Sequence, residues 1–392
     1  MSGRSASDFS GLFSGALPFC MQRRLGWISP GDPRIVRRAL QCALLAWLPA
    51  ALLAAAESRL FDLSGAGSFA ADYAVHARLL VAIPLLVLGE RFCAARLDAI
   101  AAHFPEGGRI ADRDRERFQA AVEMLSRWRD SVAARIVAVV LVYGLVATLL
   151  RETATETLPE WHVAQKETGA RLSLAGAWHA FVSLPLLLML LFGWLWRSIR
   201  WSRFLWLVSR LDLRLLPVHP DRAAGLRFVA LSVRAWIPLA AALGAIVAGT
   251  VANEVVHHGL ALLRYEYAIL GVVGFVVVLC VGPLFLFTPK LFACRFRGML
   301  QYGALADEVG REFEKRWMGP VSRVDESALE SPAFSATTDL YGVVANVYQM
   351  RVVPLEARSI ILLVVATLLP FVPVVLIVAP SLDAILETIA RL

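Results

Sequence analysis

The 392-residue sequence has little of what enzymes and metalloproteins use. It has five cysteines, and none is spaced from another as in a metal site or a disulfide framework: Cys20, Cys42, Cys93, Cys280 and Cys294. It also has no glycine-rich phosphate loop, no nucleophile elbow and no zinc-protease motif. We therefore expect no disulfides, no cofactor or metal, and no enzymatic activity.

Carboxylates are missing from the middle of every long apolar segment. Proton- or sodium-coupled transporters usually place one at mid-membrane, and the single candidate here, Glu90, lies off-centre in its segment. This disfavours a coupled secondary transporter, although unwound backbone carbonyls can also coordinate cations.

Lysine is scarce as well, since it provides only three of the 39 basic residues. Few lysines beside abundant Ala and Leu are typical of GC-rich bacterial genomes. The basic residues lie between apolar segments rather than in one basic domain, which favours anionic lipid headgroups over nucleic acid as their partner.

Apolar residues, by contrast, are abundant: 58% of the chain is hydrophobic and 18% is charged. Apolar stretches of about twenty residues recur, which is the length needed to cross about 30 Å of hydrocarbon. The sequence predicts an all-α, polytopic transmembrane bundle with seven spans, at about 39–56, 76–95, 132–150, 177–196, 228–251, 268–288 and 359–379. The second is the weakest, because its uninterrupted apolar stretch covers only 79–89, so it either spans or forms a re-entrant hairpin.

The distribution of basic residues orients these spans. Of the 39, 30 fall on one side, 7 fall on the other, and Arg135 and Arg234 lie inside spans. By the positive-inside rule the N-terminus is cytoplasmic and the C-terminus lies outside, so we expect a multi-pass protein of a bacterial inner membrane.

Four regions follow from this topology. We expect a cytoplasmic or interfacial segment at 1–38, a bundle at 39–288 that includes a cytoplasmic helix at 111–130, a cytoplasmic helical segment at 289–358, and a last span with an outer tail at 359–392. The two cytoplasmic helical stretches carry apolar stripes. These stripes either pack on each other or on the headgroups, or they assemble subunits.

Three charged residues within spans are the main candidates for a functional site. Antiparallel threading puts Glu90, Arg135 and Arg234 at a similar depth, roughly 5 to 9 Å below the cytoplasmic interface. We expect either independent snorkelling of the arginines or a pairing of Glu90 with Arg234 or Arg135. Such a pair would pin helices together or line a cytoplasmic vestibule with a role in permeation or gating.

Aromatic and basic residues interleave at the cytoplasmic end of the fourth span, an arrangement typical of an interfacial anchor in which the arginines reach lipid phosphate. The anchor comprises Trp194, Trp196, Arg197, Arg200, Trp201, Arg203 and Trp206.

Proline occurs in six of the seven spans, where it removes a backbone donor and kinks the helix. Gly282, Pro283 and Pro289 are the best hinge candidates. In the fifth span, small residues repeat at four-residue spacing, at Ala240, Gly244 and Ala248, and Gly271 and Gly274 open the next span. We expect these two spans to pack closely or to form a subunit contact.

The histidines match no metal motif, and we expect His162, His257, His258 and His76 to be ordinary surface residues. The tripeptide that begins at His219 and ends at Asp221 precedes a span, so it predicts a turn that caps the next helix.

Three cytoplasmic stretches, LDLRLLPVHPDRAAGL at 211–226, QYGALADEVGREFEKRW at 301–317 and the stretch 340–354, resemble an uncharacterised family of bacterial multi-pass membrane proteins. The resemblance implies a helical inner-membrane protein and transfers no functional residue.

Two function classes remain open. Kinked helices, the charge cluster and close-packing faces favour a homo-oligomeric ion or small-solute channel or an uncoupled permease. The lack of mid-membrane ionisable residues favours a membrane scaffold or an accessory subunit of a larger membrane complex.

Overall fold

The computed structural model describes residues 9, 11–14, 35–61, 65–129, 131–152, 160–164, 171–318 and 332–377. These residues are predominantly helical, which confirms the all-α class. Their α-helices are α2 (Ile35–Phe61), α3 (Gly65–Ala70), α4 (Tyr73–His76), α5 (Ile83–Glu106), α6 (Arg115–Arg129), α7 (Val132–Glu152), α8 (Leu174–Trp178), α9 (Leu184–Ser209), α10 (Ile237–His258), α11 (Glu266–Val281), α12 (Thr288–Trp317), α14 (Pro332–Tyr348) and α15 (Ala357–Leu368).

Short 3₁₀ and π segments join or extend these helices, and two strands of two residues pair antiparallel. The π segments are η2 (Ala77–Ala82) and η5 (His179–Ser183). The 3₁₀ segments are η3 (Asp112–Asp114), η4 (Glu160–His162), η6 (Arg227–Trp236), η7 (Leu262–Tyr265), η8 (Gly282–Phe287) and η9 (Leu369–Phe371), and the strands are β1 (Val163–Ala164) and β2 (Arg171–Leu172).

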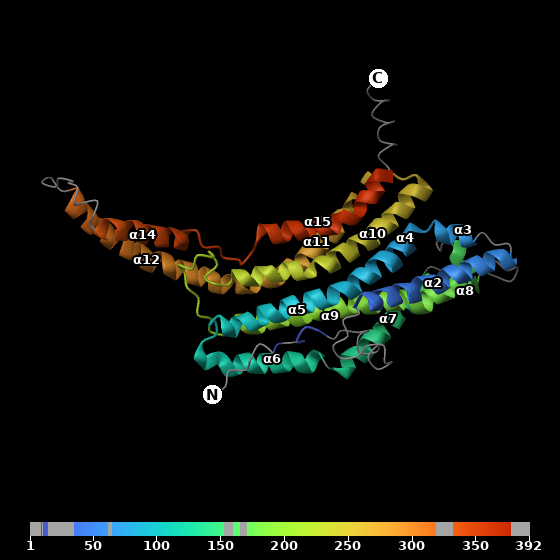
Figure 1. Ribbon diagram of the computed structural model, residues 1–392, viewed down its shortest axis with the longest axis horizontal. Coiled ribbons are helices and arrows are strands. Elements are labelled where there is room, and N and C mark those ends of the chain that lie inside the picture. Colours follow the sequence, from blue (N-terminus) through green and yellow to red (C-terminus); the bar gives the residue numbers. More distant parts are fainter. Residues whose placement is uncertain are drawn as a thin grey trace, which may run out of the picture.

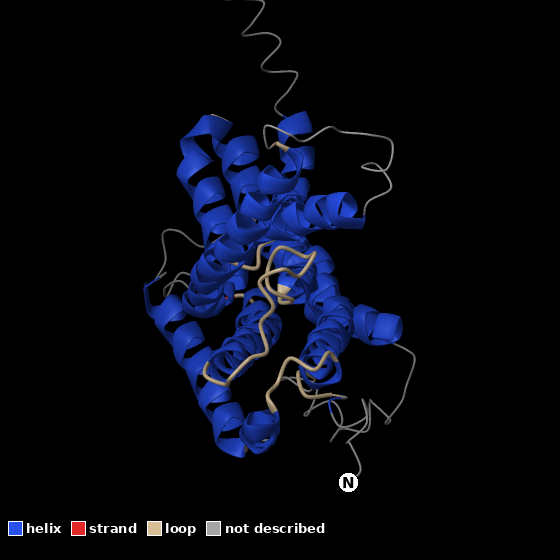
Figure 2. Ribbon diagram, turned by 90° about the vertical axis from the view of Figure 1, so that its left-hand side faces the viewer, coloured by secondary structure: helices blue, strands red, loops and turns tan. Residues whose placement is uncertain are grey.

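The long helices lie side by side along the longest axis of the molecule (Figure 1). α10, α11 and α15 form one side, α5, α9 and α2 lie in the middle, and α6 and α7 cover the opposite side. α12 and α14 run together past one end of the bundle, and the cytoplasmic location of this segment stays a prediction. The view in Figure 2 shows the helices end-on, with loops crossing that end.

Six helices of the described chain are long and apolar enough to cross a membrane: Ile35–Ser58, Val132–Arg151, Leu174–Ser209, Arg227–His258, Leu262–Trp317 and Ala357–Ile377. They match six of the seven expected spans and indicate a multi-pass membrane protein. The segment expected at 76–95 is helical, within α4, η2 and α5, but it is not among the six. Seven spans and the N-in orientation therefore stay predictions.

Prolines explain where the helices change their winding. π segments η2 and η5 end just before Pro84 and Pro185, and 3₁₀ segment η8 contains Pro283. Each proline lacks the N–H that would continue the α-helical hydrogen bonds, so the backbone widens or tightens locally. Of the hinge candidates, Gly282 and Pro283 lie in η8 and Pro289 lies in the first turn of α12, so the expected irregularity is present, and movement there stays a prediction.

The small residues of α10 are buried, but the closest approach is not to the next span. A Cβ on Gly244 would lie 2.1 Å from the carbonyl oxygen of Thr367, so α10 and α15 touch through their backbones. Ala240 and Ala248 are also buried. A Cβ on Gly271 or Gly274 of α11 would meet no described atom within 4 Å, so these two residues do not make the close contact expected of them.

The expected turn at His219 is confirmed. The carboxylate of Asp221 accepts hydrogen bonds from the amides of Ala223, Gly225 and Arg227, at 2.9, 3.0 and 3.1 Å. Burial raises the pKa of Asp221, but these hydrogen bonds outweigh it and hold the pKa below its usual value. Because Arg227 begins η6, this carboxylate caps the helical segment that leads into α10.

Candidate functional site

Glu90 is a buried carboxylate that joins three helices at the end of the bundle predicted to be cytoplasmic. From α5 it pairs with Arg38 of α2 at 3.2 Å and with Arg197 of α9 at 3.0 Å. The predicted pairing with Arg234 or Arg135 is wrong. Residue spacing predicts depth in the membrane, but it does not predict which helix faces meet.

The two predicted partners bind elsewhere. Arg234 donates to Glu356 at 2.7 Å and to Ser359 at 2.9 Å, so it links η6 to the start of α15. Arg135 donates to the carbonyl of Ser131, one turn earlier in the chain. The expected cluster of Glu90, Arg135 and Arg234 is therefore three separate sites.

Arg197 and Arg200 lie inside the protein rather than at lipid headgroups. Both are 0% exposed, and Trp194 and Trp201 on the same face of α9 are 2% and 1% exposed. The interfacial anchor is therefore wrong for these four residues. Trp194, Arg197 and Trp201 follow at intervals of three and four residues and Arg200 lies beside Trp201, so all four share the face of α9 that packs inward.

The rest of the predicted anchor lies on another face of α9. Trp196, Arg203 and Trp206 are half-buried. Trp196 stacks on Trp128 of α6, with ring centroids 5.9 Å apart, and the guanidinium of Arg203 lies 4.1 Å from the centroid of the Trp206 ring. An anchoring role stays a prediction for these three residues alone.

The buried arginines bind the backbone of the chain's own N-terminal segment, residues 11–14. Arg197 donates to the carbonyl oxygen of Phe13 at 2.9 Å, and Arg200 donates to that of Leu12 at 2.8 Å. On α5, Asp98 accepts hydrogen bonds from the amides of Gly11 and Phe13, at 2.8 and 2.9 Å. Charged side chains thus hold both the carbonyls and the amides of this short peptide.

Apolar packing also holds the segment. Phe13 is 0% exposed and Leu12 is 2% exposed. The Phe13 ring makes edge contacts with Trp201 and Phe204, with centroids 5.3 and 5.9 Å apart. Gly11 has φ +83°, a conformation that L side chains rarely adopt, so glycine permits the turn that brings Phe13 into this pocket.

Part of the predicted interfacial segment is therefore inside the protein. Residue 9 and residues 11–14 pack on the bundle, whereas most of 1–38 lies outside the described residues. We define the inner layer as Arg38, Glu90, Asp98, Arg197 and Arg200 together with the segment 11–14 that they hold.

The inner layer has more donors than acceptors. Three arginines face two carboxylates, and among the described residues Nη1 of Arg197 and Nε of Arg200 have no hydrogen-bond partner. Burial raises the pKa of Asp98, although its hydrogen bonds to residues 11 and 13 oppose this shift. The layer therefore carries net positive charge and spare N–H groups.

A second polar layer closes the opposite end of the bundle, and we call it the outer layer: Asp72, Trp161, His162, His179 and Asn253. Asp72 accepts hydrogen bonds from Trp161 at 3.0 Å and from Asn253 at 2.8 Å, and it caps α4 through the amide of Val75. Burial raises its pKa, but these hydrogen bonds prevail and the pKa lies below its usual value.

The histidines of the outer layer are not surface residues. His162 and His179 are both 7% exposed, and their rings are linked by Nε2 of His162 and Nδ1 of His179 at 3.0 Å. Burial lowers the pKa of His162 to about 4, so this ring is neutral at pH 7. The surface expectation is wrong for His162; His257 and His258 are exposed, and His76 is half-buried against Trp47.

Between the two layers the bundle is apolar. Leu79, Ile83, Leu86 and Val87 are all 0% exposed and fill the interior beside α5. Ser183 is buried there too, and its hydroxyl donates to the carbonyl of Ala46 at 2.6 Å. The described interior thus has polar groups concentrated at its two ends and a packed centre.

The chain matches no protein-family model, no curated protein and no solved structure. Within the described residues, no group of three or more His, Cys, Asp or Glu side chains is placed to hold a metal ion.

Proposed function

We propose that the protein is a homo-oligomeric channel or uncoupled permease for ions or small solutes, and that the inner layer is its closed gate. The observation that carries the proposal is the binding of the N-terminal segment by Arg197, Arg200 and Asp98, which are charged groups within the bundle. Ionisable residues inside membrane bundles are rare, and those that face the bundle interior usually mark a pathway.

The way the segment is held suits a gate. Arg197, Arg200 and Asp98 bind backbone groups, which water replaces when the segment leaves. The vacated space would then be lined by charged side chains and would fill with water. In this proposal the inner layer faces the cytoplasm of a bacterial cell, and the excess of arginine favours anions as the permeant species.

The alternative is a membrane scaffold or an accessory subunit of a larger complex. The packed apolar centre, with Leu79, Ile83 and Leu86 fully buried, favours it. In that case Glu90 and its arginines would hold α2, α5 and α9 together and gate nothing.

Two measurements on one preparation separate these classes. The mass of the protein in nanodiscs gives its oligomeric state, and ion flux from liposomes reports a conduit. We expect a defined oligomer with low flux that rises when Arg200→Gln weakens the hold on Leu12. Arg203→Gln, on the same helix but outside the inner layer, is the matched control. A monomer with no flux in any variant, or one that purifies with another protein, would support the scaffold.

A further inference from the structure

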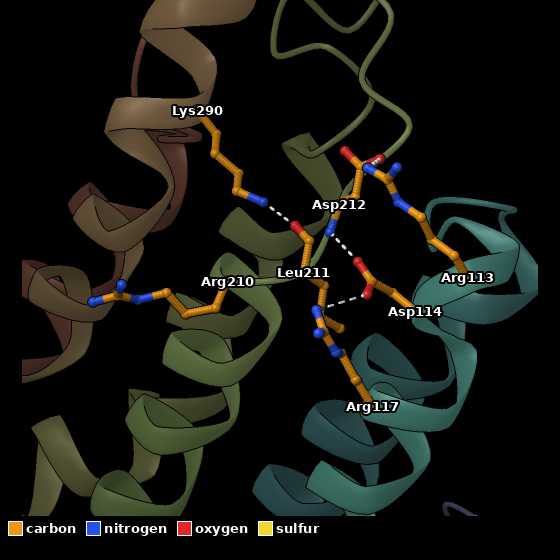
Figure 3. A pocket seen from close by; sticks show the side chains of 7 residues that line it. All are labelled: Arg113, Asp114, Arg117, Arg210, Leu211, Asp212 and Lys290. Atoms are coloured by element: carbon orange, nitrogen blue, oxygen red, sulfur yellow. Dashed lines mark hydrogen bonds and ion pairs between the residues drawn. The ribbon is translucent and has the colours of Figure 1, made fainter.

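A pocket of about 520 Å³ opens where α6, the end of α9 and the start of α12 meet. Four basic side chains and two carboxylates line it: Arg113, Arg117, Arg210 and Lys290, with Asp114 and Asp212; Leu211 completes the wall. Figure 3 shows Lys290 and Arg117 directed from opposite sides toward the backbone at residues 211 and 212. None of these residues belongs to the inner layer.

The carboxylates of Asp114 and Asp212 stabilise the walls of the pocket, because both already have partners within the protein. Asp114 accepts a hydrogen bond from the amide of Asp212 at 2.5 Å and pairs with Arg117 at 3.3 Å. The side chain of Asp212 pairs with Arg113. These contacts fix the backbone after α9 against α6, and they leave the pocket with an excess of two positive charges.

The basic side chains of the pocket have further N–H groups that could bind a ligand. Lys290 uses one of its three N–H groups on the carbonyl of Leu211, and Arg117 uses one nitrogen on Asp114 while its side chain is 76% exposed. Arg210 lies over the Trp206 ring, 5.1 Å from its centroid, and points away from Leu211 in Figure 3, so it stands at the rim.

We propose that this pocket binds a phosphate group, either that of an anionic lipid headgroup or free phosphate. Arginine forks and lysine ammonium groups are the side chains that bind phosphate oxygens in proteins, and basic pockets between membrane helices on the cytoplasmic side bind anionic headgroups. Lys290 lies two residues beyond the end of the predicted sixth span, which is headgroup depth, and Arg210 directly follows Ser209, the last residue of α9.

The two sources of phosphate are separated by native mass spectrometry and thermal unfolding of the full chain. One arm adds inorganic phosphate to protein in phosphatidylcholine nanodiscs, and the other replaces a fraction of that lipid with phosphatidylglycerol. We expect retained anionic lipid and a raised unfolding temperature in the second arm, and about fivefold weaker retention for each basic residue removed, in Arg117→Gln or Lys290→Gln. A response to phosphate alone would assign the site to the free anion.

Matched controls carry the same loss of charge outside the pocket. Arg127→Gln on α6 and Arg297→Gln on α12 remove exposed arginines and should bind lipid as the unmodified protein does. Arg210→Gln keeps the test valid if the other variants fail to fold, because the side chain of Arg210 stands at the rim. The proposal is overturned if neither phosphate source binds, or if pocket and control variants lose binding equally.

Discussion

The inner and outer layers solve the same problem in different ways. Each must accommodate a buried carboxylate at one end of an apolar bundle. Asp72 in the outer layer is met by neutral donors, Trp161 and Asn253, whereas Glu90 in the inner layer is met by Arg38 and Arg197. Neutral donors satisfy the hydrogen-bonding capacity of the Asp72 carboxylate and add no positive charge beside it. Arginines bring additional N–H groups, and in the inner layer these bind the backbone of the segment 11–14, which our proposal treats as detachable.

Among substitutions in the two layers, we expect the largest loss of stability at Glu90. Glu90→Gln leaves two arginines buried without their carboxylate and should lower the free energy of unfolding by about 3 to 5 kcal/mol. Thermal or denaturant unfolding in detergent measures it. Glu116→Gln on the exposed side of α6 is the control, and equal losses in the two variants would show that the inner layer is not held by this pair.

Asp72→Asn tests the outer layer in the same way, with a smaller loss. The amide keeps one acceptor oxygen for three donors, so the free energy of unfolding should fall by about 2 kcal/mol. Ion flux should not change, because the proposed gate lies in the inner layer. If Asp72→Asn raised ion flux as much as Arg200→Gln does, the two layers would not differ in function.

The outer layer should also weaken in acid. His162 is buried with a pKa of about 4 against an ordinary value of 6.5, so the folded state favours the neutral ring. Its contribution is fully present above pH 6.5 and is lost as the pH falls toward 4, about 3 kcal/mol in all. Unfolding followed from pH 7 to 4 measures this, and His162→Gln should flatten the dependence. An unchanged slope in that variant would assign the effect to another group.

The smallest change concerns backbone conformation. Gly11→Ala should loosen the segment by about 1 kcal/mol, because φ +83° is strained for alanine, and flux should rise modestly. Gly108→Ala is the matched control, since Gly108 has φ +65° and a Cβ there would meet no described atom within 4 Å. If both variants change flux alike, the strain at Gly11 is irrelevant to gating.

Hydropathy and proline positions predicted most of the fold, because apolar length and a missing N–H act locally. The site was harder to predict. Residue spacing put Glu90 at a similar depth to Arg135 and Arg234, but its partners depend on helix rotation, which spacing does not encode. The burial of Arg197 was encoded in part, since Trp194, Arg197 and Trp201 form one helical face; the sequence pattern was equally compatible with a face toward lipid.

Other parts of the site left no recognisable signal. Nothing in the sequence near Phe13 indicates that its backbone binds Asp98 and Arg200, which are far away in the chain. His162 lies in the short 3₁₀ segment η4, where the sequence has no apolar periodicity, and its contact with His179 far along the chain helps to bury it.

The central claim is tested most directly by deleting residues 2–14. Ion flux from liposomes that contain the shortened chain is compared with flux from liposomes that contain the full chain at equal protein density. The account predicts that flux is about tenfold higher with the shortened chain. This is the factor expected if the bound segment 11–14 stabilises the closed state by about 1.4 kcal/mol. A correctly folded shortened chain with the same flux as the full chain would contradict it.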